Sequence, residues 1–358
     1  MLNALKEACD LGTSIFIFGA GEIGGRVIKI LEKENIRISA VCDNDENKQK
    51  NNFYNYEVLS ADAVQKKNSI VIVASIYAKE IVSQLHDLGI ENIVLYKELF
   101  LKKNEKYDKL VFPRFTNPKV SIVLTAYNEW KYTYECLKSI LSTKTDIEYE
   151  VIVGENASTD DTKDIEKYVE NITVVHYKEN IGYLRNCNET VKAAKSKYVV
   201  LLSNDVKIIS DYWLDQWLET IEREPEIGVV GGSTCDWDLT LKYGGKVIFS
   251  GDKIKLIDND KLSGICDVDY VSPACMCFRA DAWRKIGGFD ERYIPAWWED
   301  LDLFCSMRKM GYRVVLNTET PYIHYGEVTA IKNNTIIQEN LQKFMDKWSD
   351  DLQFVVTE

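Results

Sequence analysis

Residues 119–129 read KVSIVLTAYNE, an apolar run that predicts a buried β-strand and passes directly into polar residues. The same arrangement recurs further along the chain, as YEVIVG at 149–154 before ENAST, ITVVHY at 172–177 before KENIG, and YVVLL at 198–202 before SND. Ligands of open α/β sheets bind outside the carboxyl ends of the strands. The pattern therefore predicts an α/β fold with a binding site at that edge of its sheet.

An earlier stretch, SIFIFGAGEIGG at 14–25, predicts a second sheet of this kind, because strand and helix patterns alternate from there to residue 96. Its G-x-G-x-x-G turn consists of Gly19, Gly21 and Gly24, and the next strand ends at Asp43, where such folds place an acid for a ribose hydroxyl. Two interpretations stay open: a nucleotide at the helix N-terminus, or glycines that serve close packing alone. NAD is not an expected cofactor, because the stretch lacks the second half of a full dinucleotide site.

Length and pattern together predict three segments. A chain of 358 residues is about twice the usual domain size. We expect a small Rossmann-like parallel α/β domain at 1–101, a linker at 102–117 and a larger α/β domain at 118–358. Apolar residues at helical spacing over 335–348 predict a C-terminal helix in the larger domain.

The net charge of −12 belongs to the larger domain, because residues 1–117 hold 16 basic and 16 acidic side chains. Nucleic acid is not an expected partner, since phosphate contacts need a basic surface, and a phosphate ligand here would need a cation. No apolar run reaches the ~20 residues of a membrane-spanning helix, the first residues do not resemble a signal peptide, and the nine cysteines fit free thiols. We expect a cytoplasmic protein, and leave open a peripheral position at the inner face of the membrane and a homo-oligomer.

The larger domain resembles the inverting family 2 glycosyltransferases, which have a GT-A fold. Seven stretches in the expected order carry the resemblance: TAYNE at 125–129, ENASTDDT at 155–162, NIGYLRNCN at 180–188, LLSNDV at 201–206, GGFDERY at 287–293, WWEDLDL at 297–303, and His324. The first domain resembles small Rossmann-like domains attached to bacterial sugar-modifying enzymes. The chain is thereby expected to move a sugar from a nucleoside diphosphate sugar to a glycan, lipid-linked or protein acceptor.

The resemblance also implies which residues bind the donor. A Mn²⁺ or Mg²⁺ ion, held by Asp205 and His324, would neutralise the diphosphate leaving group. The family's D-x-D motif is incomplete here, because Ser203 stands in place of its first Asp. The nucleotide-sugar itself is expected to contact Thr125, Ala126, Tyr127, Glu129, Glu155, Asn156, Gly182, Asn188 and Asn204.

The acceptor side is expected in WWEDLDL. By resemblance Asp300 is the catalytic base that removes the proton of the acceptor hydroxyl, and Glu299 assists acceptor binding. Trp297 and Trp298 are placed to stack on sugar faces, although core packing explains them equally well. We expect Asp302 to be a helix-stabilising acid, since carboxylates are favoured at helix starts.

Two other classes of function stay open. An NAD-dependent oxidoreductase would use the first domain, but no Tyr-x-x-x-Lys pair follows there at a suitable spacing. A non-catalytic nucleotide-sugar-binding protein would not need the Glu299-Asp300 pair. The sequence names neither the sugar nor the acceptor.

Overall fold

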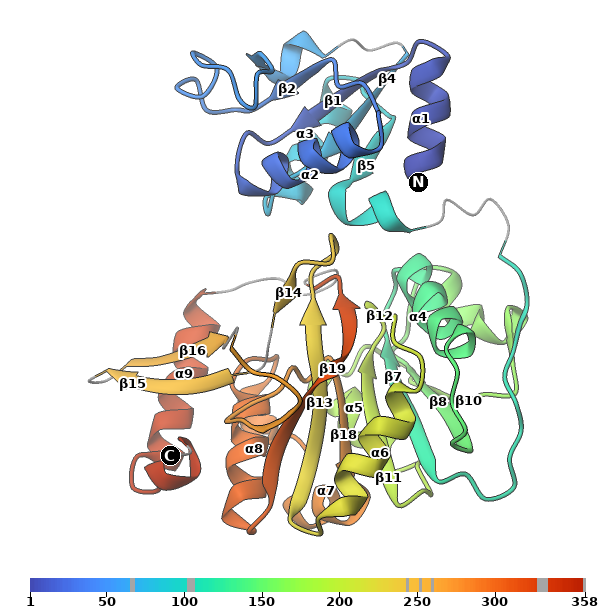
Figure 1. Ribbon diagram of the computed structural model, residues 1–358, viewed down its shortest axis with the longest axis vertical. Coiled ribbons are helices and arrows are strands. Elements are labelled where there is room, and N and C mark those ends of the chain that lie inside the picture. Colours follow the sequence, from blue (N-terminus) through green and yellow to red (C-terminus); the bar gives the residue numbers. More distant parts are fainter. Residues whose placement is uncertain are drawn as a thin grey trace. The chain divides into compact units, whose positions relative to one another are not determined.

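The computed structural model describes residues 1–64, 68–101, 107–242, 245–250, 253–258, 261–326 and 334–356. The chain forms two compact units, Met1–Glu105 and Lys106–Glu358 (Figure 1). Each unit is built around its own parallel strands, so the expected α/β class is confirmed.

The first unit is a five-stranded sheet in the order β3-β2-β1-β4-β5, in which all paired neighbours are parallel. Its apolar strand residues, such as Phe16 and Val71, are buried together with α3 residues. The strands are β1 (Ser14–Phe18), β2 (Ala40–Cys42), β3 (Val58–Leu59), β4 (Ser69–Val73) and β5 (Ile93–Leu95). The helices are α1 (Leu2–Asp10), α2 (Glu22–Lys33) and α3 (Ala78–Asp87), with short turns η1 (Ala61–Ala63) and η2 (Tyr96–Phe100).

The second unit contains, within the described residues, a ten-stranded mixed sheet. Its path runs β10-β8-β7-β11-β18-β13-β19-β12, with β14 on β13 and β17 on β19. These strands are β7 (Val120–Ala126), β8 (Tyr149–Glu155), β10 (Thr173–His176), β11 (Tyr198–Ser203), β12 (Val206–Ile208), β13 (Ile227–Cys235), β14 (Leu241–Lys242), β17 (Ile265–Asp267), β18 (Cys275–Arg279) and β19 (Arg313–His324).

Helices cover both faces of this sheet (Figure 1). One hydrophobic cluster holds side chains of α4 and α6, and another holds side chains of α5, α7, α8 and α9. These helices are α4 (Trp130–Ser142), α5 (Tyr183–Val191), α6 (Trp213–Arg223), α7 (Ala280–Ile286), α8 (Glu299–Lys309) and α9 (Asn334–Trp348). Short turns are η3 (Asp161–Lys167), η4 (Glu291–Tyr293) and η5 (Leu352–Phe354).

Two small strand pairs lie outside the main sheet. One is a hairpin of β15 (Gly245–Ser250) and β16 (Lys253–Asp258). The other joins β6 (Leu110–Val111) to β9 (Val169–Glu170). Phe112 is buried in a core cluster of the second unit, so residues 110–112, part of the expected linker, pack with that unit.

The four parallel strands end at one edge of the sheet. Ala126 pairs with Glu155, Glu155 pairs with His176, and Ser203 pairs with Thr125. Every residue of β7 is buried, as expected for a central parallel strand covered on both faces. The polar residues that follow each strand are therefore brought together. Among the described residues, no helix is long and apolar enough to span a membrane.

Candidate active site

The loop after β7 is locked against the loop after β8. Asn128 and Glu129 have φ of 53° and 57°, the left-handed region, and they lead into α4. The Asn128 N–H donates to Ser158 Oγ at 2.8 Å, and the Thr159 N–H donates to Asn128 Oδ1 at 2.7 Å. Among the expected contacts of the donor, Thr125 and Ala126 are the last residues of β7, and Tyr127 and Glu129 lie in this loop.

Glu155 is buried at the end of β8, and its carboxylate has two neighbours. Its Oε1 accepts from the Ser158 N–H at 2.6 Å, and its Oε2 lies 3.3 Å from His176 Nδ1. His176 Nε2 contacts Glu166 at 2.7 Å, and this hydrogen bond raises the pKa of His176. His176 was not among the expected site residues, although its place at the end of a predicted strand marks it as close to the site.

Amide side chains organise the turn before α5. Asn156 Nδ2 donates to Asn180 Oδ1, and the Ile181 N–H donates to Asn156 Oδ1, both at 2.9 Å. Gly182 has φ of 82°, a conformation that favours glycine, and α5 begins directly after it. Asn156 and Gly182 therefore shape the same turn, and their contacts with a donor stay predictions.

Two other amides that were expected at the donor hold backbone and neighbouring side chains. Asn188 exchanges hydrogen bonds with the backbone of Phe289, both at 2.8 Å. Asn204 Nδ2 donates to Thr133 Oγ1 at 3.0 Å. Both amides are buried, so their structural roles are clear, and their contacts with a donor stay predictions.

Asp205 and His324 meet across two strands. Val206 of β12 pairs with His324 of β19, and Asp205 Oδ1 lies 3.4 Å from His324 Nε2. A carboxylate oxygen and an imidazole nitrogen so close together can bind one divalent ion, and the carboxylate oxygen is a donor that suits Mn²⁺ or Mg²⁺. The described residues contain no cluster of three or more His, Cys, Asp or Glu that could hold a metal. These two ligands would thus leave positions for donor oxygens.

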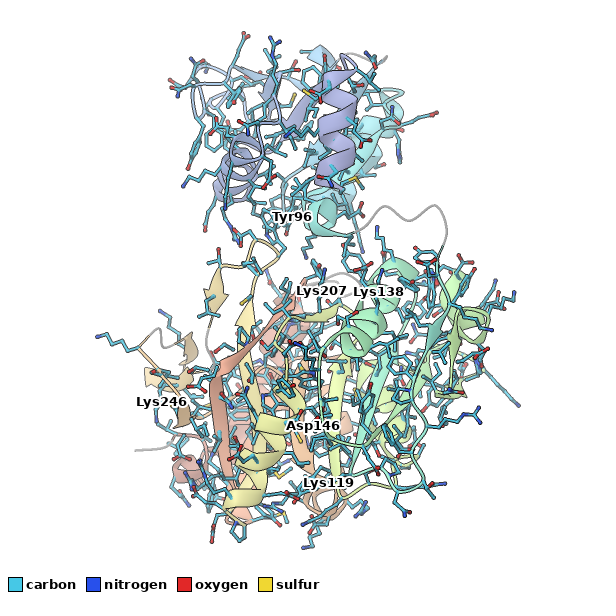
Figure 2. All side chains as sticks on the ribbon, turned by 45° about the vertical axis from the view of Figure 1, so that its right-hand side comes forward. Tyr96, Lys119, Lys138, Asp146, Lys207 and Lys246 are labelled. Carbon is cyan, nitrogen blue, oxygen red and sulfur yellow. The ribbon has the colours of Figure 1, made fainter. Side chains whose placement is uncertain are left out.

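Lys207 of β12 forms an ion pair with α4. It follows Asp205 by two residues, and its Nζ lies 3.8 Å from Glu135 Oε2 (Figure 2). Glu135 Oε1 and the hydroxyl of Tyr325 are buried and have no hydrogen-bond partner among the described residues. The positive charge of Lys207 is therefore paired with Glu135, a contact that local sequence patterns did not reveal.

Glu299 and Asp300 begin α8. Glu299 is only 5% exposed, and its Oε2 has no hydrogen-bond partner within the described parts of the chain. Burial, and then the charge of Asp300, raise the pKa of Glu299 to about 8. Burial likewise raises the pKa of Asp300, whose Oδ1 accepts from the Leu301 N–H at 2.8 Å. A carboxylate with a raised pKa is a stronger base.

Glu299, Thr125 and Ser203 lie close enough to α5 to influence the pKa values of two of its side chains. Burial, together with the charges of Cys187 and Glu299, raises the pKa of Tyr183, which also lies within hydrogen-bonding reach of Ser203. Burial also raises the pKa of Cys187; the charge of Glu299 adds to this shift, and hydrogen bonds with Tyr183 and Thr125 oppose it. Glu299 and residues at the ends of β7 and β11 therefore lie near the same two α5 side chains.

Both tryptophans before the acid pair have left-handed backbones, with φ of 74° for Trp297 and 75° for Trp298. The ring of Trp298 packs on Phe344 with centroids 5.6 Å apart, and its Nε1 donates to the Ile337 carbonyl at 3.1 Å. Trp298 is thus part of the contact with α9. A role of either residue in acceptor binding stays a prediction.

In the first unit, the carboxylate of Asp43 accepts hydrogen bonds from other residues of the chain. Its Oδ2 accepts from the Ala20 N–H at 2.8 Å and from Lys48 at 2.9 Å, and its Oδ1 accepts from the Asp45 N–H. Despite burial, these hydrogen bonds lower the pKa of Asp43. A side chain at Gly24 would collide with the Gly19 carbonyl, so this glycine permits close packing of α2, whereas Gly21 faces open space.

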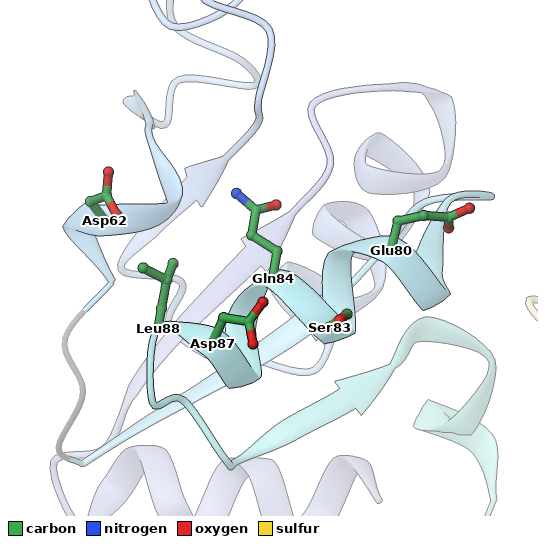
Figure 3. A pocket seen from close by; sticks show the side chains of 6 residues that line it. All are labelled: Asp62, Glu80, Ser83, Gln84, Asp87 and Leu88. Atoms are coloured by element: carbon green, nitrogen blue, oxygen red, sulfur yellow. The ribbon is translucent and has the colours of Figure 1, made fainter.

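The first unit also has an acidic hollow of about 560 Å³ beside α3 (Figure 3). Asp62, Glu80 and Asp87 line it, together with Ser83, Gln84 and Leu88. Gln84 exchanges hydrogen bonds with Asn44, the residue after Asp43. Three carboxylates repel a pyrophosphate, so this hollow gives no support to a dinucleotide site.

The second unit thus combines polar strand ends, a carboxylate–imidazole pair and an acid pair with raised pKa values, an arrangement typical of enzymes that transfer a group from a phosphate-bearing donor. Residues 121–283 match the family model of glycosyl transferase family 2, and residues 12–94 match the model described as C2185-like, N-terminal. The second unit therefore contains a stretch that is similar to family 2 glycosyltransferases, and it has a GT-A fold. The matched stretch includes Asp205 and ends before Asp300 and His324.

Related proteins agree with this assignment. The chain is 25% identical over 228 residues to O-antigen biosynthesis protein RfbC of Myxococcus xanthus, covering 60% of this chain and 18% of the relative. It is 25% identical over 252 residues to chondroitin synthase of Escherichia coli, covering 69% of this chain and 35% of the relative. The chain therefore spans less than half the length of these two relatives.

A solved structure shows the same fold. The crystal structure of GalNAc-T7 with UDP, GalNAc and Mn²⁺ aligns with a TM-score of 0.54 at 10% identity. The alignment covers 66% of this chain and 49% of that one.

Proposed function

We propose that the second unit transfers a sugar from a nucleoside diphosphate sugar to an acceptor hydroxyl, with inversion at the anomeric carbon. The observation that carries this proposal is the buried Glu299–Asp300 pair, whose Glu299 lies near the same α5 side chains as Thr125 and Ser203 at the strand ends. A protein that only bound the donor would have no use for a carboxylate with a raised pKa at this place.

Asp300 is the proposed base. It accepts the proton of the acceptor hydroxyl as the oxygen attacks the anomeric carbon, and the bond from that carbon to the diphosphate oxygen breaks. The raised pKa of Asp300 favours this proton transfer. A single displacement with one base forms no sugar–enzyme bond, so the product has the opposite anomeric configuration to the donor.

Asp205 and His324 would hold the Mn²⁺ or Mg²⁺ ion, which when bound stabilises the charge of the departing diphosphate. Their separation of 3.4 Å suits two ligands of one ion. The loops after β7 and β8 would hold the nucleoside through backbone groups and through Tyr127, Glu155 and Asn156.

The acceptor is proposed to be a growing glycan or its lipid-linked precursor. Relatives named for O-antigen biosynthesis and for chondroitin synthesis support a carbohydrate acceptor. The first unit is proposed to have no part in the chemistry, since its Asp43 is already bound by Ala20 and Lys48.

The test begins with a panel of nucleoside diphosphate sugars, each added with Mn²⁺, Mg²⁺ or a chelator while the melting temperature is followed. The sugar that stabilises the protein is then used to measure release of nucleoside diphosphate. Asp300→Asn should lower turnover by about 10²- to 10⁴-fold and leave donor affinity nearly unchanged. Asp281→Asn, at an exposed site on α7, is the matched control. Near-normal turnover in Asp300→Asn, or a product that retains the configuration of the donor, contradicts the mechanism.

A further inference from the structure

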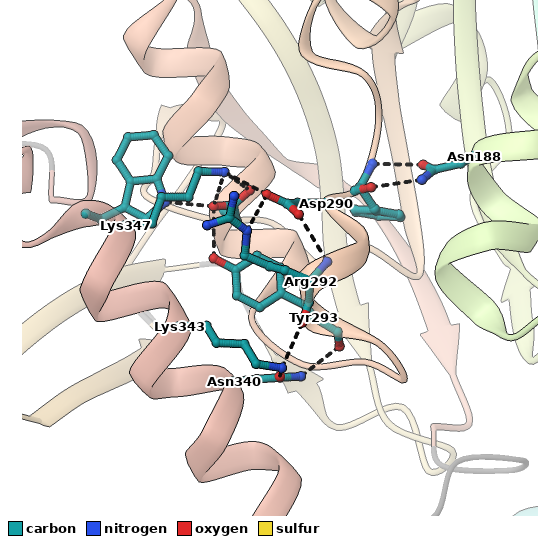
Figure 4. A network of polar contacts seen from close by, with 10 residues as sticks. Asn188, Asp290, Arg292, Tyr293, Asn340, Lys343 and Lys347 are labelled. Carbon is teal, nitrogen blue, oxygen red and sulfur yellow. Dashed lines mark hydrogen bonds and ion pairs between the residues drawn. The ribbon is translucent and has the colours of Figure 1, made fainter.

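The C-terminal helix α9 is bound to the segment that carries the acid pair. Asn340 is fully buried, and its Nδ2 donates to the carbonyls of Tyr293 at 2.7 Å and Ala296 at 2.8 Å. Lys343 donates to the Arg292 carbonyl and to Asn340 Oδ1, both at 2.8 Å (Figure 4). One turn of α9 thus holds the carbonyls of the chain just before Trp297.

The next turn of α9 is bound to α8 itself. Lys347 donates to Asp302 Oδ2 at 2.9 Å and to Asp290 Oδ2 at 3.1 Å, and Trp348 Nε1 donates to Asp302 Oδ1 at 2.8 Å (Figure 4). The hydroxyl of Tyr293 also donates to Asp302. Asp302 is therefore a buried ion-pair partner of α9, which explains why a third acid follows Glu299 and Asp300.

Between these two sets of contacts the backbone is strained. Trp297 and Trp298 both have positive φ, a conformation that bulky residues rarely adopt and that is unfavourable for them. It persists only where the surroundings fix it, and here the fixing groups are the Asn340 amide and the bond from Trp298 to Ile337. The strained turn leads directly into Glu299 and Asp300.

We infer that Asn340 is a positioning residue, which sets the direction of the Asp300 carboxylate by holding the turn at 293–298 against α9. This inference rests on the proposed function, in which Asp300 is the base. Asn340 touches no donor residue among those described above, so its effect must be on turnover rather than on donor binding. A displacement of about 1 Å at a catalytic group can cost roughly 10²-fold in rate.

The experiment compares Asn340→Ala with Gln342→Ala in the full chain. Gln342 is exposed on the same helix and donates to Asp346, one turn further along α9, so it is the matched control. The donor is the nucleoside diphosphate sugar selected by the panel, and turnover is the rate of nucleoside diphosphate release. Calorimetric titration with the donor gives the concentration of binding sites. Dividing the rate by this concentration gives a kcat that counts folded protein alone.

We expect Asn340→Ala to lower kcat per binding site by at least about fivefold with donor KM within about twofold of wild type, and Gln342→Ala to change neither. A smaller fall in kcat, or a KM that rises in proportion, overturns the inference. If Asn340→Ala does not fold, Lys343→Met is compared with Gln342→Met: a lower kcat in Lys343→Met alone supports the inference, and equal values overturn it. A wild-type protein that neither binds nor cleaves any donor overturns the proposed function, and the inference with it.

Discussion

Replacing Glu299 by glutamine should stabilise the second unit, and more so as the pH rises. In the unfolded chain this carboxyl ionises near its ordinary pKa of 4.5, whereas burial and the charge of Asp300 raise its pKa to about 8 in the folded unit. Between these values the folded state holds a proton that the unfolded state has lost. The free energy of unfolding of the wild type must therefore fall as the pH increases through this range.

The size of the effect follows from the proton balance. Each pH unit between the two pKa values removes about 1.4 kcal/mol, so a step from pH 5 to pH 7 removes about 3 kcal/mol. A glutamine side chain keeps the shape and hydrogen-bonding capacity of the neutral acid but cannot ionise. Glu299→Gln should thus match the wild type near pH 5 and exceed its stability by about 3 kcal/mol at pH 7.

Urea unfolding followed by tryptophan fluorescence measures this difference, because all eight tryptophans follow residue 117 and report the second unit. Glu319→Gln, at an exposed site on β19, is the control and should show no dependence of this size. A Glu299→Gln variant whose stability relative to wild type is the same at pH 5 and pH 7 would refute the view that Glu299 is neutral in the folded unit. So would a variant that becomes relatively less stable at pH 7.

Three further predictions concern other parts of the molecule. Asp205→Ala should abolish the Mn²⁺- or Mg²⁺-dependent rise in melting temperature with the donor; an unchanged rise contradicts the ion site. His176→Gln should cost most stability below pH 6.5, and this cost should shrink as the pH rises through the raised pKa of His176, which urea unfolding measured from pH 5 to pH 9 can follow. A chain of residues 107–358, which retains β6, should fold and release nucleoside diphosphate from the donor at a near wild-type rate; a folded fragment that cannot bind donor means that both units form the site.

The sequence predicted the parallel strands well because burial on both faces leaves a clear apolar run. The strand expected at 149–154 is observed as β8, and the helix expected at 335–348 is observed as α9, each with an end moved by one residue. The long strand β19 was not predicted as a whole, because Asn317, Thr318 and Glu319 interrupt its apolar pattern. It is held by pairing with β13, which lies about 90 residues earlier and cannot be read from a local pattern.

For the candidate site, sequence motifs predicted which residues to examine but not which other residues they contact. Asp302 was expected to stabilise the start of α8, and the structure instead pairs it with Lys347 and Trp348. The contact between Glu155 and His176 joins two strands, and the contact between Asn340 and Ala296 joins a helix to a distant loop. Such contacts depend on how helices and strands pack against one another. No local sequence motif around these residues therefore predicts them.

The acidic charge of the second unit bears on how its candidate site could bind a diphosphate. This unit carries most of the excess of acidic residues, and nearby carboxylates that keep their charge oppose the approach of a diphosphate. Burial raises the pKa of Glu299, which favours its neutral form, and Glu155 lies against His176, whose pKa is raised by its hydrogen bond with Glu166. Asp205 lies beside His324, and this is the place where the proposed divalent ion would bring positive charge to the donor. Under this proposal the ion would occupy one position of the acidic site rather than several.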